Sequence, residues 1–343
     1  MTRKVCVIGA GIIGLSTAVC IIEQIPDVQV TIIADKFTPE TTGDGANGVW
    51  SPVLSGQTCI DVMTRWGSVT WDHLTDLLHS EDAAPAGVKL VLGYHLYTSQ
   101  KEEPYWKDIV LGFRRISTKE IQTVFPVDCG FTHGFSFNTI VTECSTYLPW
   151  LTKRFQQKGG KIQCRRICSI GEVDKIFDVV VNCSGVHAYH LVNDKEVTVI
   201  KGQMVKVRAS WQKWYVSAKS KNGVVTNLTP KSDHVVLGST RDFGNWDTDV
   251  CLDVSIDIYN RCCKLVPSLK NAEIIGGWSG LRPGRTSVRL ARENMMFGLH
   301  ILPVVHNYGH GGSGVTLHWG CAQDATELVR QCLQDLSNFP SKL

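Results

Sequence analysis

The sequence predicts an α/β fold in which a Rossmann-like domain, assembled from separated stretches of chain, is interleaved with an α+β domain containing a mostly antiparallel sheet. Three observations carry this prediction. An apolar stretch at residues 5–8 runs into a glycine-rich turn and a helical pattern. A second continuous apolar run, at residues 177–182, has the composition of a buried parallel strand. Elsewhere apolar and polar residues alternate, as in residues 202–209, which is typical of antiparallel strands.

The N-terminal stretch VCVIGAGIIGLSTA indicates a dinucleotide-binding turn. Gly9 permits the tight turn, Gly11 lets a pyrophosphate approach the backbone, and Gly14 lets the helix pack closely against the strand. A second strand pattern, VQVTIIAD, ends at Asp35, whose carboxylate can accept hydrogen bonds from ribose hydroxyls. A glycine-rich turn alone can be purely structural, but here a strand, a helix and an acidic strand end accompany it. The motif does not distinguish NAD from FAD, although its position ahead of any substrate domain favours FAD.

The rest of the chain alternates between the two predicted domains. Residues 36–52 are rich in threonine and glycine and predict a loop, either a plain surface loop or one that offers amides and hydroxyls to a phosphate. Residues 58–137 mix helical and strand patterns without a nucleotide motif, and residues 302–333 give a strand, a glycine-rich loop and a long helix. We therefore expect an FAD-binding domain from residues 1–56, 140–192 and 288–343, and a substrate-binding domain from residues 57–139 and 193–287.

Composition excludes some classes of partner. Lys and Arg number 35 against 32 Asp and Glu, a net charge of +3, so neither nucleic acid nor an anionic membrane surface is indicated. No stretch has the length of a membrane span, and we expect a soluble intracellular protein. The chain has 13 cysteines, an odd number scattered through apolar segments, which favours reduced thiols.

Metal binding is also considered and not expected. His306, His310 and His318 lie close together in the sequence, but their flanks lack acidic partners. We expect no metal site.

The chain ends in Ser341, Lys342 and Leu343, the SKL tripeptide that peroxisomal import receptors recognise. The residues before it have the composition of an exposed end. We therefore expect localisation to the peroxisomal matrix through that receptor.

Several stretches, in a common order, resemble the D-amino acid oxidase family, and most closely its branch that acts on acidic substrates. They are VIGAGIIGLS, DKFTPETT with GVWSP, TYLPWL, VVVNCSGV, KGQMVKV, LGSTRDFGNW, SGLRPGR and HNYGHGGSGVTLHWG, of which the last two are the most specific. The resemblance covers nearly the whole chain. It implies an FAD-dependent oxidase that converts acidic D-amino acids, D-aspartate or D-glutamate, into a 2-oxo acid, ammonia and hydrogen peroxide. The alternatives are a preference for neutral or basic D-amino acids, an NAD-dependent dehydrogenase, and a flavin-binding protein without turnover.

The resemblance also implies which residues hold FAD. They come from the N-terminal turn, the loop after the second strand and the glycine-rich C-terminal loop: Gly9, Gly11, Ile12, Gly14, Asp35, Lys36, Thr42, Gly43, Asn47, Gly48, Val49, Gly311, Gly312, Gly314, Val315 and Thr316.

Two arginines are the leading catalytic candidates. Arg282, in SGLRPGR, matches the residue that grips the substrate α-carboxylate in the family, and its planar fork suits two carboxylate oxygens. The alternative for it is a solvated loop charge. Arg241, in LGSTRDF, matches the position where the acidic-substrate branch carries arginine. Its alternative is an ion pair with Asp242 or Asp247.

One departure concerns a tyrosine that the family carries near the active-site lid. Asn227 stands in its place in VVTNLTPKSDH, so we expect either that carboxylate binding depends more on the arginine of SGLRPGR or that the substrate preference differs from that of the family. Lys219, Lys221 and Ser313 are further candidates for substrate contacts.

Overall fold

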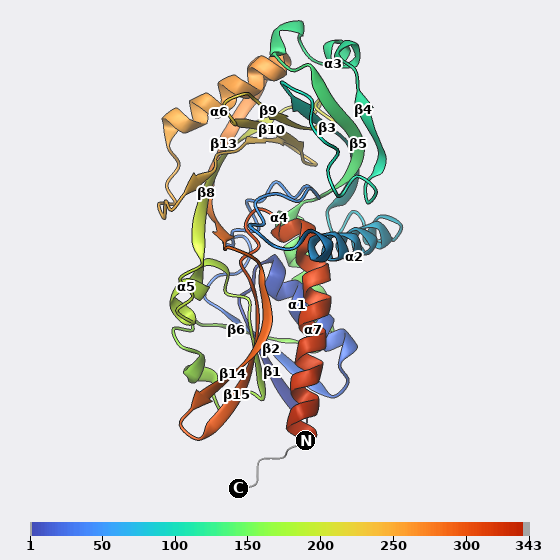
Figure 1. The fold of residues 1–343 in the computed structure, drawn as a ribbon. Helices are drawn as coiled ribbons and strands as arrows, with labels where there is room; N and C mark the ends of the chain where they lie inside the picture. Colours follow the sequence, from blue (N-terminus) through green and yellow to red (C-terminus); the bar gives the residue numbers. More distant parts are fainter. Residues whose placement is uncertain (1, 339–343) are drawn as a thin grey trace.

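Two β-sheets, one in each half of the molecule, organise the computed structural model, which describes residues 2–338 (Figure 1). The first sheet has six strands in the order β14-β15-β7-β1-β2-β6. All neighbours in it are parallel except β14 and β15, which form an antiparallel pair. The strands are β1 (Arg3–Ile8), β2 (Val28–Ala34), β6 (Lys161–Cys164), β7 (Val179–Asn182), β14 (Arg289–Phe297) and β15 (His300–Tyr308).

The continuous apolar runs form the centre of this sheet, as predicted. Every residue of β7 is buried, and Val5 of β1 lies beside Val179 in the parallel register. Both faces of a parallel sheet are covered by other elements, so such strands need no polar face. Helices α1 (Ile12–Gln24), α4 (Cys144–Gln157) and α7 (Gly314–Asn338) pack with one another beside the sheet (Figure 1).

The second sheet has nine strands and is mostly antiparallel, which confirms the alternation seen in the sequence. Its order is β12-β8-β11-β10-β9-β3-β5-β4, with β13 pairing to β8, and the β3–β9 pair is the parallel exception. The strands are β3 (Val88–Tyr97), β4 (Leu111–Ile116), β5 (His133–Thr142), β8 (Thr198–Arg208), β9 (Tyr215–Lys219), β10 (Val225–Pro230), β11 (Val235–Gly238), β12 (Asp242–Phe243) and β13 (Glu273–Gly284).

The remaining helices cover the second sheet or join the two halves. Helix α6 packs on β8, β10 and β11, and α2 crosses α7 near the junction of the two halves (Figure 1). The amphipathic stretch predicted as a helix in residues 58–137 is α2. These elements are α2 (Ile60–Leu78), α3 (Thr118–Val124), α5 (Ala188–Leu191) and α6 (Leu252–Leu265), with short 3-10 turns at Val127–Cys129, Ile170–Val173, Gly185–His187 and Pro267–Asn271.

Strand membership supports the proposed division into two interleaved domains. All strands of the first sheet come from residues 1–56, 140–192 and 288–343, and those of the second come from the other segments, apart from the last residues of β5. Helix α2 belongs by sequence to the second unit but packs against α7 of the first. All thirteen cysteines are free. Within residues 2–338, no helix combines the length and apolar character that crossing a bilayer requires.

The crossing of α2 and α7 depends on a glycine. A Cβ added at Gly320 would lie 2.3 Å from the carbonyl oxygen of Trp66 and 2.5 Å from its Cα. Because both contacts are backbone atoms of a packed helix, the clash can be relieved only by moving α2. We predict that Gly320→Ala lowers the free energy of unfolding by about 1–3 kcal/mol.

Denaturant unfolding of Gly320→Ala and of Gln334→Ala, an exposed position on the same helix, tests this prediction. The control should unfold at the wild-type midpoint. Equal midpoints for the two variants would show that the helices tolerate a closer side chain.

Candidate active site

Two adjoining cavities lie where the two halves meet. The larger, of about 610 Å³, opens at the carboxyl ends of β1, β2 and β7. The smaller, of about 200 Å³, is lined by residues from both sheets and from the loops between them. Thr42, Trp278 and Pro283 line both cavities, so the two are neighbours. Ligands of doubly wound proteins bind at the carboxyl ends of the parallel strands, and the larger cavity has that position.

The glycine-rich turn after β1 has the geometry of a phosphate cradle. Gly9 has a φ of +110°, and a Cβ on it would lie 2.5 Å from the carbonyl oxygen of Cys183. A Cβ on Gly14 would lie 2.0 Å from the carbonyl oxygen of Gly9, so this glycine lets α1 pack against the turn. A Cβ on Gly11 would meet no atom within 4 Å. The fold therefore requires Gly9 and Gly14, whereas Gly11 keeps open a space that a pyrophosphate fits.

The larger cavity also contains the predicted ribose-binding residues. Asp35 and Lys36, at the end of β2, line it and are exposed. His187, His190 and Trp246 line it as well, and the sequence did not single them out. Trp246 packs edge-on against Tyr189, 5.9 Å between ring centroids, although it comes from the loop after β12. The adenine end of a dinucleotide fits here, beside the acidic strand end.

The predicted residues of the second and third cofactor segments meet in the smaller cavity. Its lining includes part of the loop after β2 and part of the loop before α7, which are more than 260 residues apart in the chain. The predicted cofactor residues that line it, from these two loops, the start of α7 and the start of α1, are Ile12, Thr42, Gly43, Asn47, Gly48, Val49, Gly311, Gly312, Gly314 and Val315. The N-terminus of α7 begins at Gly314, so its amides and helix dipole favour negative charge at this wall.

Two residues predicted to contact ligands, Ser313 and Thr316, have side chains that hydrogen-bond a neighbouring loop. The Ser313 hydroxyl lies 2.6 Å from the Ser55 hydroxyl and accepts a 2.8 Å hydrogen bond from the Val53 N–H. The Thr316 hydroxyl accepts a 3.1 Å hydrogen bond from the Ser51 N–H. Both side chains are buried and do not line either cavity. These hydroxyls fix the 51–55 segment against the start of α7, and the assignments of Ser313 and Thr316 as ligand contacts stay predictions.

The prediction for Lys219 and Lys221 is corrected. Both are exposed and lie outside the lining of the two cavities, because they occupy the end of β9 and the turn that follows. They are not placed to contact a bound substrate.

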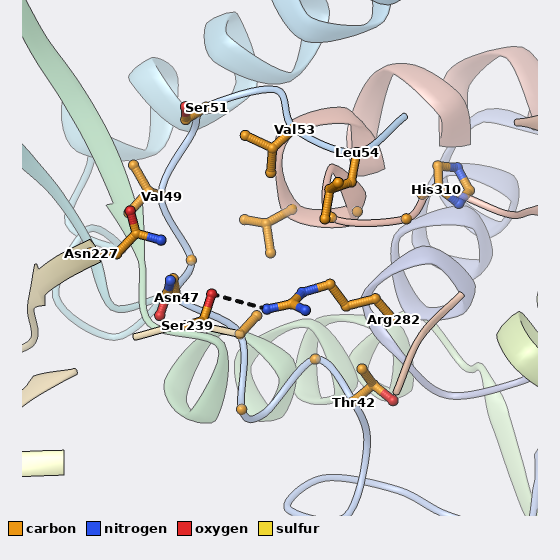
Figure 2. Close-up of a pocket in the computed structure, with 18 of the residues that line it drawn as sticks. Thr42, Asn47, Val49, Ser51, Val53, Leu54, Asn227, Ser239, Arg282 and His310 are labelled. Carbon is orange, nitrogen blue, oxygen red and sulfur yellow. Dashed lines mark hydrogen bonds between the residues drawn. The ribbon is translucent and has the colours of Figure 1, made fainter. Parts of the chain in front are cut away.

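Arg282 points from β13 into the smaller cavity (Figure 2). Its guanidinium donates to the Thr240 carbonyl oxygen at 3.1 Å and to the Ser239 hydroxyl at 3.2 Å. Gly202 makes room for it, because a Cβ there would lie 2.4 Å from two guanidinium nitrogens. Burial, followed by the positive charge of Arg241, lowers the pKa of Arg282 to about 10. Within the described residues no carboxylate pairs with it, so the site presents a desolvated cation that an anion would stabilise.

Arg241 shares this cavity but is an exposed residue, so it lies where the cavity meets solvent. Burial of part of the side chain lowers the pKa of Arg241. The acids considered as its partners are engaged elsewhere. Asp247 accepts from Lys201 at 2.6 Å, and Asp242 accepts from the Asn245 amide at 2.8 Å. Arg241 has no ion-pair partner in the described part of the chain.

A polar wall that the sequence analysis missed faces Arg282. Tyr215 and Ser217 lie on one face of β9, and Asn227 of β10 is paired directly with Ser217. Burial raises the pKa of Tyr215 to about 12, so it stays a neutral phenol. A tyrosine therefore does line the cavity, from β9 rather than from the position that Asn227 occupies. Side chains of one strand alternate between faces, so the spacing of Tyr215 and Ser217 was a usable signal.

Several polar atoms of this cavity have no hydrogen-bond partner among residues 2–338. They are Asn47 Oδ1, Ser51 Oγ, Asn227 Oδ1 and His310 Nε2. Figure 2 shows Asn47, Asn227 and Ser51 on one side of the cavity and His310 on another. Buried polar atoms are normally paired, so these atoms indicate a wall completed by a bound polar group. The isoalloxazine end of FAD, with its ring oxygens and nitrogens, fits that requirement.

The three histidines considered as metal ligands lie on different elements: His306 on β15, His310 in the loop before α7 and His318 in α7. His306 bonds Glu293 at 3.1 Å, and His318 donates to the Val315 carbonyl oxygen at 2.7 Å. Burial, and the neighbouring His318, lower the pKa of His310 to about 3, so it is neutral. No group of three or more His, Cys, Asp or Glu residues able to hold a metal occurs in the part of the chain described.

The structure therefore combines a glycine-rich cradle of the kind that holds a dinucleotide with an adjoining cavity lined by two arginines, as expected for an enzyme with a nucleotide cofactor. A family model described as FAD dependent oxidoreductase matches residues 4–328. The human D-aspartate oxidase is 41% identical over 337 residues, covering 98% of this chain and 97% of that protein. The D-amino-acid oxidase of Rubrobacter xylanophilus is 36% identical, covering 97% and 98%. The chain therefore belongs to the D-amino acid oxidase family of FAD-dependent oxidoreductases, and its cofactor is FAD.

Solved structures confirm the fold. Glycine oxidase from Geobacillus kaustophilus superposes with a TM-score of 0.77 at 18% identity, covering 96% of this chain and 95% of that one. L-alpha-glycerophosphate oxidase from Mycoplasma pneumoniae, with FAD bound, gives 0.72 at 15% identity, covering 96% and 95%. At these identities the likeness concerns architecture, which agrees with the predicted Rossmann-like domain and second α+β domain.

The cradle glycines give a paired prediction. Gly11→Val fills space that no protein atom occupies, so the protein should fold but purify without flavin. Gly14→Val places side-chain atoms against the backbone of Gly9, so it should lower the melting temperature of the apoprotein as well. The flavin-to-protein ratio and the thermal unfolding of both apoproteins test this. Full flavin content in Gly11→Val would contradict the cradle assignment.

Proposed function

We propose that this member of the D-amino acid oxidase family acts on acidic D-amino acids, with D-aspartate as the leading substrate and D-glutamate as the second. The products would be the 2-oxo acid, ammonia and hydrogen peroxide. One observation carries the proposal: Arg282 and Arg241 both line the smaller cavity, and neither is neutralised by a carboxylate of the described residues. Two unpaired cations in one cavity are complementary to a molecule that carries two carboxylates.

Arg282 is the proposed partner of the α-carboxylate, which every amino acid substrate carries. Its side chain is held by Ser239 and Thr240, so the planar fork is already oriented when substrate arrives. A bidentate contact fixes the carboxylate plane as well as its position. Because the Arg282 guanidinium is partly desolvated, the contact also removes the cost of a desolvated charge without a partner.

Arg241 is the proposed partner of the second, side-chain carboxylate. It lies nearer to solvent than Arg282, which places the substrate side chain toward the cavity entrance. A neutral D-amino acid would leave Arg241 unpaired but hydrated, so it would bind less tightly rather than be excluded. The human relative named D-aspartate oxidase supports this assignment, while the relatives named D-amino-acid oxidase keep neutral or basic substrates as the alternative.

The chain supplies orientation and electrostatics rather than acid–base groups. FAD, when bound, accepts the two electrons and the hydrogen removed from the substrate Cα and passes the electrons to oxygen. Of the residues that line the smaller cavity, none is acidic, and His310 is neutral, so no carboxylate there competes for the arginines. Holding the carboxylates on two arginines fixes the substrate Cα relative to the cavity walls, which lowers the entropic part of the barrier.

The predicted selectivity depends on Arg241. We predict that Arg241→Ala lowers kcat/KM for D-aspartate about tenfold to a hundredfold more than for D-alanine, because a hydrogen bond to a charged group contributes about 1.5–3 kcal/mol. Arg241→Lys, which keeps the charge, is the matched variant and should retain part of the preference. Steady-state kinetics on the two substrates give the ratio. An unchanged ratio in Arg241→Ala would show that this arginine does not recognise the second carboxylate.

Localisation is a separate proposal. The SKL tripeptide at residues 341–343 lies outside the described residues, and its role rests on the sequence alone. We propose that a peroxisomal import receptor reads it. Deletion of Leu343 should move the enzyme to the cytosol and leave kcat/KM unchanged, because the tripeptide is far in sequence from every cavity residue. Microscopy of the tagged protein, with the tag at the N-terminus, tests this, and continued import would contradict it.

A further inference from the structure

Lys231 places an ammonium group behind the wall of the smaller cavity. The residue lies in the turn between β10 and β11, and its Nζ donates a 2.7 Å hydrogen bond to the Asn47 carbonyl oxygen. Asn47 belongs to the loop that lines the cavity. Burial lowers the pKa of Lys231 to about 8, so most molecules carry the charge at pH 7.

This ammonium has no acidic partner among the described residues. Glu143 is a carboxylate whose charge raises the pKa of Lys231. It accepts hydrogen bonds from Lys89 and Ser232, each at 2.8 Å. Lys89 and Lys206 add positive charge nearby, and Cys144 is a neutral thiol whose pKa burial raises to about 11. A buried cation without a paired anion is unfavourable, so a function at the cavity wall would explain why it is there.

The peptide that the ammonium contacts is rigid. Gly48 has a φ of +70°, and a Cβ on it would lie 1.9 Å from the Thr142 carbonyl oxygen. The Thr142 N–H donates to the Gly48 carbonyl oxygen at 2.7 Å. The loop that contains Asn47 and Gly48 is therefore held against the end of β5, and Lys231 contacts a part of the loop whose position is fixed.

The orientation of this peptide connects the charge to the cavity. In a trans peptide the C=O and N–H groups point in opposite directions. The Asn47 C=O accepts from the Lys231 ammonium, so the N–H of the same peptide, which belongs to Gly48, points away from Lys231. That N–H has no hydrogen-bond partner among residues 2–338, and Gly48 lines the cavity. A positive charge on the carbonyl side polarises the peptide and strengthens its N–H as a donor.

We propose that Lys231 is a positioning residue for the flavin: through the Asn47–Gly48 peptide it stabilises negative charge in the smaller cavity and raises the reduction potential of bound FAD. The inference rests on the proposed placement of the isoalloxazine in that cavity. Reduction adds two electrons to the ring, so a fixed positive charge behind the wall favours the reduced form over the oxidised form.

The reduction potential of the bound flavin tests this directly and needs no amino acid substrate. Lys231→Gln keeps a hydrogen-bond donor for Asn47 and removes the charge, while Lys231→Arg keeps the charge. We expect Lys231→Gln to lower the preference for reduced over oxidised FAD about tenfold, which equals a fall of about 30 mV for a two-electron couple. Lys231→Arg should stay close to wild type.

Lys221→Gln is the matched control, because Lys221 is exposed, lies outside the lining of both cavities and is not among the groups that act on Lys231. It should leave the potential unchanged. If Lys231→Gln does not fold with FAD, Lys231→Met supplies a second neutral variant. An unchanged potential in a neutral variant, or equal falls in the neutral and Arg variants, would overturn the proposal. Because potentials are measured without substrate, a failure to oxidise D-aspartate would count against the proposed function and not against this inference.

Discussion

The half-buried side chain of Arg282, whose guanidinium is partly desolvated, is the constraint on which the rest of the site depends. The guanidinium has lost part of its water, its described partners are a carbonyl and a hydroxyl, and Arg241 adds a second positive charge to the same cavity. Each of these features is unfavourable for the empty protein. The glycine at 202 opposite it, and the pairing of β13 with β8, hold it in place despite that cost. A bound anion would offset this cost, and we propose that the substrate α-carboxylate is that anion.

Contacts between loops that are distant in the chain form the walls of the smaller cavity. Buried hydroxyls of Ser313 and Thr316 fix the 51–55 segment against the start of α7. Gly311, whose Cβ would lie 1.8 Å from the Leu54 carbonyl oxygen, allows the loops to approach each other. The glycines of the C-terminal loop thus serve loop-to-loop packing as well as cofactor access, which limits what can change there without loss of the cavity.

Local patterns were sufficient to predict the strand, turn and helix of the cradle and the continuous apolar strands, whereas the role of Arg282 was expected from the family resemblance and stays a prediction. The continuous apolar runs of β1 and β7 and the alternation of residue types in β8 indicate which kind of sheet each strand belongs to, because burial on one or both faces dictates the pattern. Interactions between distant segments were not predictable in that way. Ser313 was predicted to contact the substrate, and the sequence around it gives no sign that its hydroxyl forms hydrogen bonds with residues 53 and 55. Tyr215 and Lys231 act from strands and turns whose register the sequence does not fix.

The central claim is that two arginines divide the recognition of one dicarboxylate. A crystal structure of the FAD-bound protein with succinate, which has two carboxylates but no amine to oxidise, tests it most directly. We expect one carboxylate on the Arg282 guanidinium, in the plane of its fork, and the other within hydrogen-bond distance of Arg241. Succinate bound with neither carboxylate on Arg282, or with the second carboxylate turned away from Arg241, would contradict it.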